Sequence, residues 1–152
     1  MGMKRLTPVS QIDDFVQSKI ERLERLIIRN LAYVGETCVN VARDTDSYKD
    51  QTANLRSSIG YILIKNGEVI QMSSFQKEKD KDGNIGGDAG VLEGPKFAKS
   101  LIKIFPQGIV LVVVAGMNYA HHVASNGYDV LDSAQLIAER EVPKIMKKLG
   151  FK

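Results

Sequence analysis

The sequence lacks tryptophan, has one cysteine, and contains no apolar run of membrane-spanning length. Cys38 cannot form a disulfide within the chain, and its place among apolar helical positions predicts a small buried hydrophobic residue. The longest apolar stretch, 108–117, is far shorter than the ~20 residues that a membrane helix needs. The first residues lead into polar ones, so we expect no secretory signal. These absences predict a protein that is made in the cytoplasm and has no membrane contact.

A strong excess of one charge sign is also missing. The formal net charge is only +3, whereas nucleic-acid binding typically requires a dense basic stripe or interleaved aromatic residues. Lysines do gather near the C-terminus, where cations complement the negative end of a helix dipole. They are Lys144, Lys147, Lys148 and Lys152. A small DNA-binding or regulatory protein that acts through these lysines stays open as an alternative function.

The chain has no complete catalytic or metal-binding motif. It contains no GxSxG elbow, no phosphate-binding glycine loop, and no HExxH or CxxC pair. His121 and His122 are adjacent, and neighbouring side chains on a helix point about 100° apart, which does not suit one shared ion. We therefore expect no catalytic residue, no cofactor and no metal site, and we expect that the protein is not an enzyme.

One polar segment imitates the start of a calcium-binding loop. Asp80, Asp82 and Asn84 alternate as the oxygen ligands do at positions 1, 3 and 5 of an EF-hand loop. Ile85 then stands where the sharp turn needs glycine, and Val91 where a bidentate carboxylate is needed. The favoured interpretation is a solvated turn, and weak cation binding stays open.

The clearest helical pattern lies near the N-terminus. Ser10 predicts the helix start because its hydroxyl can accept an unpaired backbone N–H, and Asp13 and Asp14 suit the positive end of the dipole. Apolar residues then recur at spacings of three and four to about Arg43, which predicts one buried face. These residues are Val16, Ile20, Leu23, Ile27, Leu31, Val34, Cys38 and Val41. At ~1.5 Å per residue this helix is roughly 45 Å long, which favours assembly with a neighbour, and Gly35 is a candidate bend.

A β-hairpin is predicted over residues 61–72. Two apolar, β-branched runs flank an Asn-Gly pair at 66–67, and this pair supplies the two positive-φ residues of a type I′ turn. The following residues, 73–95, are rich in Lys, Asp, Gly and Ser and show little periodicity. Because this stretch is too long for an ordinary hairpin loop, it predicts a mobile loop or arm.

The C-terminal third predicts further helices around one strand. Pro95 opens a short helix, and the β-branched run 108–116 predicts the central strand of the sheet, covered on both faces. A capping box at Asp132 opens a last helix that Pro143 kinks or restarts and Gly150 caps. The whole chain, 1–152, is then a single α+β domain, with a long N-terminal helix packed on an antiparallel β-sheet beside a C-terminal helix.

Two segments carry a resemblance to a known family. Residues 50–60 (DQTANLRSSIG) follow the long helix, and residues 115–120 (AGMNYA), with Val123 and the segment 127–131 (GYDVL), follow the later strand. The pair resembles the tail-completion, or putative tail-component, family of long-tailed bacteriophages and prophages, over roughly 20–150. Ala53 stands where the family usually has Gly and Ala124 where it has Glu, so its electrostatic details are not carried over.

The resemblance implies a non-enzymatic structural protein of the virion. Such a protein would complete the tail or head–tail junction, the neck, as an oligomeric ring and most simply a hexamer. It would lie between the connector and portal side and the tail terminator or tube. DNA would pass through its channel without sequence-specific binding, and the protein would be made in the cytoplasm of the bacterial host. Another ring subunit, such as a tail terminator or connector adaptor, stays open as an alternative.

Several residues of the two segments are candidates for contacts between subunits. Arg56 suits an interface ion pair, and a tyrosine combines an apolar body with a polar group. Core packing is the competing interpretation for each of them. The candidates are Thr52, Asn54, Arg56, Tyr119, His122 and Tyr128. The loop at 73–95 is a further hypothesis, since a polar loop that orders on assembly can wrap a partner.

Overall fold

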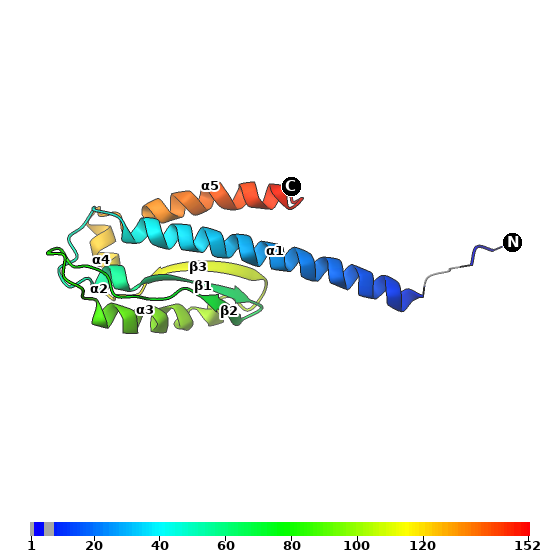
Figure 1. The fold of residues 1–152 in the computed structure, drawn as a ribbon, viewed down its shortest axis with the longest axis horizontal. Coiled ribbons are helices and arrows are strands. Elements are labelled where there is room, and N and C mark those ends of the chain that lie inside the picture. Colours follow the sequence, from blue (N-terminus) through cyan, green and yellow to red (C-terminus); the bar gives the residue numbers. More distant parts are fainter. Residues whose placement is uncertain (1, 5–7) are drawn as a thin grey trace.

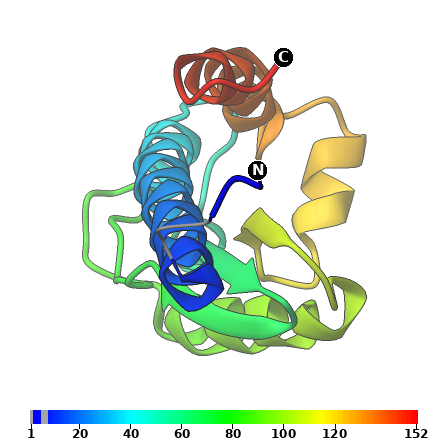
Figure 2. The same ribbon diagram turned by 90° about the vertical axis from the view of Figure 1, so that its right-hand side faces the viewer.

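The fold is α+β, as the sequence predicts, and it has three layers. The computed structural model describes residues 2–4 and 8–152. An antiparallel sheet of strand order β2-β1-β3 lies between α1 and α5 on one face and α3 on the other (Figures 1 and 2). The elements are α1 (Val9–Arg43), α2 (Asn54–Ser57), β1 (Ile59–Lys65), β2 (Glu68–Met72), α3 (Asp88–Ser100), the 3-10 helix η1 (Ile102–Ile104), β3 (Ile109–Ala115), α4 (Ala120–Ser125) and α5 (Asp132–Lys148). None of the described helices is both long and apolar enough to span a bilayer.

The long helix α1 has two halves with different surroundings. Its C-terminal half packs on β1, β3 and α5 through buried residues such as Val34 and Cys38. Its N-terminal half extends beyond the sheet (Figure 1). The helix runs unbroken through Gly35, where an added Cβ would lie 2.8 Å from Cγ of Tyr61, so this glycine allows close packing. The predicted cap is wrong: Ser10 lies inside the helix, which begins after Pro8 without a side-chain cap.

The predicted hairpin is confirmed, and β1 is the strand at its centre. Asn66 and Gly67 form the turn with φ values of 50° and 80°. Side chains alternate along β1: Tyr61 and Leu63 join the core under α1, whereas Ile62 joins the core over α3. The prediction that 108–116 forms the central strand is wrong, since among the described strands β3 pairs with β1 alone and lies at an edge of the sheet. Helices cover both faces of β3, and a pattern of facial burial does not reveal whether an edge is paired.

The segment predicted as a loop up to Pro95 is partly helical. Helix α3 begins at Asp88, so Pro95 lies within the helix and does not open it. Asn54 replaces proline as the start signal, because its side-chain oxygen accepts the N–H groups of Ala89 and Gly90. The sequence hid this helix because its buried face consists of Gly90, Gly94 and Ala98 rather than large apolar residues.

Residues 73–87 form an irregular segment that is attached to the core at several points. The guanidinium of Arg43 donates to the carbonyl of Ser74 at 3.1 Å, and the hydroxyl of Ser57 accepts the N–H of Glu78 at 2.9 Å. Both oxygens of Asp80 serve its own turn, and the N–H of Asn84, followed by that of Asp82, lowers the pKa of this carboxyl. The solvated turn is therefore formed by the loop itself, and the mobility of the segment stays a prediction.

The last helix begins and ends through different signals. The predicted capping box at Asp132 is wrong, because the side chain of Asp129 accepts the N–H of Ser133 instead, at 3.1 Å. The helix passes through Pro143 without restarting. The predicted cap at Gly150 is confirmed. Its φ is 95°, its N–H donates to Lys147, and the N–H of Phe151 donates to Met146, as in a Schellman motif.

The close contact of α3 predicts a specific destabilisation. In Gly90→Ala the new methyl would lie 2.1 Å from the carbonyl oxygen of Asn54, a backbone atom that cannot rotate away. We expect the free energy of unfolding in urea to fall by about 1–3 kcal/mol despite the better helix propensity of alanine. Leu92→Ala, at a position on the same helix that is 64% exposed, should change it by less than about 0.5 kcal/mol. Equal effects of the two substitutions would contradict this packing.

Candidate interface pocket

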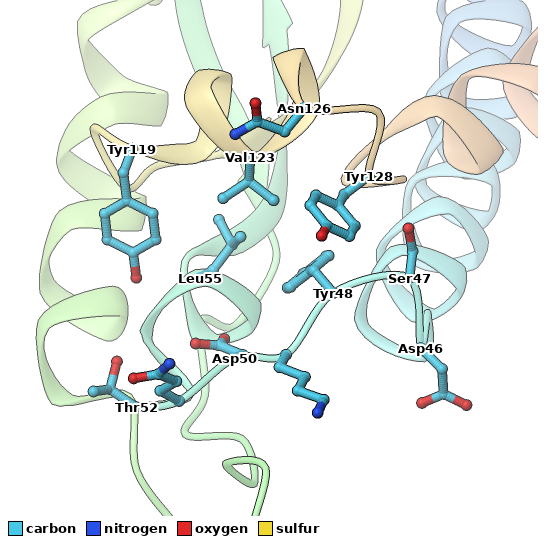
Figure 3. Close-up of a pocket in the computed structure, with 12 residues that line it drawn as sticks. Asp46, Ser47, Tyr48, Asp50, Thr52, Leu55, Tyr119, Val123, Asn126 and Tyr128 are labelled. Carbon is cyan, nitrogen blue, oxygen red and sulfur yellow. The ribbon is translucent and has the colours of Figure 1, made fainter.

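A pocket lies at the end of the molecule opposite the projecting part of α1. It has a volume of about 780 Å³ and is formed by the segment 46–52, α2, α4 and the segment that leads into α5 (Figure 3). We call it the motif pocket, because both segments that carry the resemblance contribute to it. Its lining residues are Asp46, Ser47, Tyr48, Lys49, Asp50, Gln51, Thr52, Leu55, Tyr119, Val123, Asn126 and Tyr128.

Three of the six predicted interface residues meet in this pocket. Tyr119 and Thr52 line one side, with the tyrosine hydroxyl pointing toward Thr52, and Tyr128 lines the other side (Figure 3). The two tyrosines are 37% and 46% exposed, so their rings are accessible to a partner. Tyr119 is half-buried, which raises the pKa of its hydroxyl, and the nearby carboxylate of Asp50 adds to this effect.

The other three predicted residues lie outside the pocket lining. Asn54 uses its side-chain oxygen on the N–H groups at the start of α3. His122 is exposed on α4 and lies 3.2 Å from the amide of Asn126, which does line the pocket. Arg56 packs behind the pocket, where its guanidinium donates to the carbonyl of Thr45 at 2.7 Å. The structure therefore assigns Asn54 and Arg56 clear roles within the subunit.

The floor of the pocket depends on Asp50, Tyr48 and Arg56. Asp50 is 6% exposed, and its carboxylate accepts the backbone N–H of Arg56 at 2.8 Å, which fixes the start of α2. The Arg56 guanidinium lies 5.6 Å from the centre of the Tyr48 ring, a cation–π distance. The sequence reasoning missed Tyr48 as a site residue. Its signal was weak, because it lies just before the recognised segment 50–60.

Tyr48 carries a buried hydroxyl that has no hydrogen-bond partner among the described residues. Burial raises the pKa of Tyr48 to about 12, against the opposing effect of the Arg56 cation. The Arg56 Nε is likewise buried without an acceptor. Buried polar groups without a hydrogen-bond partner lower the stability of the fold. The residues that form the floor of the pocket are therefore not fully hydrogen-bonded.

A hydrogen bond joins the two wall segments of the pocket across a long stretch of chain. The hydroxyl of Ser47 accepts the N–H of Asp129 at 2.7 Å. Asp129 in turn holds Ser133 at the start of α5 through both of its carboxylate oxygens. The position of Tyr128, next to Asp129, is therefore tied to the loop that carries Tyr48.

The pocket presents groups that bind by stacking and hydrogen bonding. Three tyrosines, two apolar side chains, amides, hydroxyls and charged groups of both signs face one open space. Within 2–4 and 8–152, no group of three or more His, Cys, Asp or Glu side chains is placed to hold a metal ion. The adjacent histidines of α4 are both exposed.

Comparison with protein-family models, with curated proteins and with solved structures gives no match to this chain.

The unpaired hydroxyl of Tyr48 predicts a pH dependence. The folded-state pKa is about 12 and the unfolded one ~10, so the unfolded chain ionises Tyr48 more readily than the folded one. The free energy of unfolding is therefore unaffected by this group below pH 10 and falls as pH rises from 10 to 12. Tyr48→Phe should be at least as stable as the wild type at pH 7. Between pH 10 and 12 the wild type should lose about 2–3 kcal/mol relative to this variant in urea unfolding.

A matched control is Tyr33→Phe, because Tyr33 is 69% exposed. That variant should follow the wild type across the same pH range. A parallel decline of the wild type and Tyr48→Phe would show that the hydroxyl of Tyr48 keeps an ordinary pKa.

Proposed function

We propose that the chain is a structural subunit of the head–tail junction of a long-tailed bacteriophage or prophage, and that it acts as an oligomeric ring. One observation carries the proposal. Residues 50–60 resemble the tail-completion family, as do 115–120 with Val123 and 127–131, and these segments converge on the motif pocket although they are far apart in sequence. The convergence is explained if both segments contribute to one binding surface. The order of elements also agrees with the fold that the resemblance implies.

The exposed tyrosines make the pocket suitable for a protein partner. Tyrosine is enriched where interfaces have well-packed centres, and polar groups around it provide a wet rim. Tyr119 and Tyr128 stand on opposite sides of the opening, with Leu55 and Val123 between them (Figure 3). A side chain or short loop of a neighbouring protein in the neck, on the portal or the tail side, would fit between the two rings.

The ring is supported by the shape of α1. A helix of 35 residues is about 50 Å long at ~1.5 Å per residue, and only its C-terminal half lies over its own core. Head-to-tail contacts between identical subunits close into a ring when the rotation between them is a simple fraction of a turn. A tail terminator or connector adaptor would also form a ring of head-to-tail subunits. Only its binding partner would distinguish such a protein from a tail-completion protein.

The pocket predicts a loss of joining without a loss of folding. In the phage that encodes the chain, Tyr128→Asp should lower the yield of joined virions at least about tenfold, as expected for a residue at the centre of an interface. Electron microscopy of lysates should then show separate DNA-filled heads and complete tails. The purified variant should keep the thermal midpoint of the wild type within a few degrees.

Ile104→Asp is the control, because Ile104 is 62% exposed and lies on η1, away from the motif pocket. It should leave virion yield unchanged. Normal virions from Tyr128→Asp, or a wild-type chain that is not part of purified virions, would overturn the proposed function.

A further inference from the structure

The motif pocket contains a buried carboxylate that has no counter-ion. Asp50 lines the pocket although it is only 6% exposed, and its Oδ2 accepts the backbone N–H of Arg56 at 2.8 Å. None of the ion pairs in the described part of the chain includes Asp50. Acidic side chains are rarely buried to this extent without a partner of opposite charge. The pocket therefore offers one negative charge to a group that enters it.

The cationic side chains around the pocket do not neutralise this carboxylate. The guanidinium of Arg56 lies 5.6 Å from the centre of the Tyr48 ring and forms no ion pair with Asp50. Lys49 lines the pocket with an exposed side chain. The lining contains two carboxylates, those of Asp46 and Asp50, and one ammonium, although the chain as a whole carries a formal charge of +3. The lining is therefore opposite in sign to the chain.

Tyrosine rings surround the same space. Tyr119 and Tyr128 stand on opposite sides of the opening, and Figure 3 shows the Asp50 carboxylate between the side chains of Tyr119 and Tyr48. Burial raises the pKa of Tyr119, and the negative charge of Asp50 raises it further, so the carboxylate acts on this side of the pocket. The face of a tyrosine ring attracts a cation within about 6 Å. Rings and carboxylate together favour a positively charged occupant.

An anionic occupant is a weaker match. The hydroxyl of Tyr48 and the Nε of Arg56 are donors without acceptors, but both atoms are buried, so a group in the open pocket does not reach them. An anion would instead meet the carboxylates of Asp46 and Asp50, and like charges repel each other.

Among cationic side chains, arginine suits the arrangement best. Its planar guanidinium can stack on a tyrosine ring while its N–H groups donate to a carboxylate. Arg56 already makes a cation–π contact with Tyr48 in the same molecule. The pocket volume of about 780 Å³ lies in the range of pockets that hold a whole small ligand, so it also admits the residues on either side of such an arginine.

We infer that the motif pocket binds an arginine side chain of a neighbouring protein in the neck, with the guanidinium between the tyrosine rings and the Asp50 carboxylate. The inference rests on the proposed function, which supplies the neighbouring protein, and it adds the chemistry of that partner: an arginine on an exposed loop. Asp50 then has two roles, because it fixes the start of α2 and neutralises the incoming cation.

A short peptide with one charge tests this chemistry on the full chain. The probe is acetyl-Gly-Arg-Gly-amide, and the control is the same peptide with citrulline, which keeps the shape of arginine and lacks its charge. In NMR spectra of the chain with ¹³C-labelled tyrosine, the arginine peptide should shift the ring signals of Tyr119 and Tyr128. The signal of Tyr33, which is 69% exposed and outside the pocket, should stay unchanged. The citrulline peptide should bind at least about tenfold more weakly.

A variant of the carboxylate gives a second measurement. Asp50→Asn removes the charge, while the amide oxygen can still accept the N–H of Arg56. The variant should keep the thermal midpoint of the wild type within a few degrees and bind the arginine peptide at least about tenfold more weakly. Asp14→Asn is the matched control, because it changes the net charge equally at an exposed position on α1. It should bind the peptide as the wild type does.

The comparison of peptides on the wild type decides the inference even if Asp50→Asn does not fold. Equal binding of the arginine and citrulline peptides, binding of neither, or stronger binding of acetyl-Gly-Glu-Gly-amide would overturn it. The proposed function would survive that result if Tyr128→Asp still blocked the joining of heads to tails. Charge-selective binding by a chain that is absent from purified virions would overturn only the proposed function.

Discussion

The burial of β1 between two helical layers is the constraint on which the rest of the fold depends. Its side chains from Ile59 to Ile64 have essentially no solvent exposure, and they alternate between the core under α1 and the core over α3. Both helices must approach closely. Gly35 permits this contact with Tyr61 on one side. On the other side, Gly90 and Gly94 let α3 approach α2 and Ser58, the residue that precedes β1. A strand covered in this way fixes how closely each element that packs on it can approach the sheet.

The same strand positions the motif pocket through the two serines that precede it. Ser58 accepts the N–H of Met117 through its hydroxyl and that of Gly116 through its carbonyl, at 3.3 and 3.1 Å. Ser57 holds Glu78 and, with it, the irregular segment after the hairpin. The junction of α2 and β1 therefore fixes the start of the chain that carries Tyr119. The pocket is rigidly connected to the core although it lies at the end of the molecule.

The sequence predicted the elements whose signals are local and strong. The hairpin at 66–67 and the glycine cap at Gly150 follow from backbone preferences, and the long helix follows from its periodicity. The predictions were wrong where a contact distant in sequence replaced a local signal. Asn54 caps α3 from the other side of the hairpin, and the edge position of β3 depends on which strand pairs with it.

The candidate site shows the same limit. Thr52, Tyr119 and Tyr128 could be selected because the recognised segments contain them, and the structure brings all three to one pocket. Their grouping depends on the hydrogen bond between Ser47 and Asp129, which no pattern in the sequence indicates. For the same reason the sequence could not distinguish Arg56 and Asn54 from the accessible candidates. Both residue types suit an interface, and only the fold shows that these two side chains make their hydrogen bonds within the subunit.

Helix α4 is the wall that the motif pocket shares with a smaller apolar groove on its other side. Val123 and Asn126 face the pocket, whereas Ala120, His121 and Ala124 face the groove. This helix has six residues, of which Ala120 is buried, at 9% exposure, so few buried contacts within the subunit hold it in place.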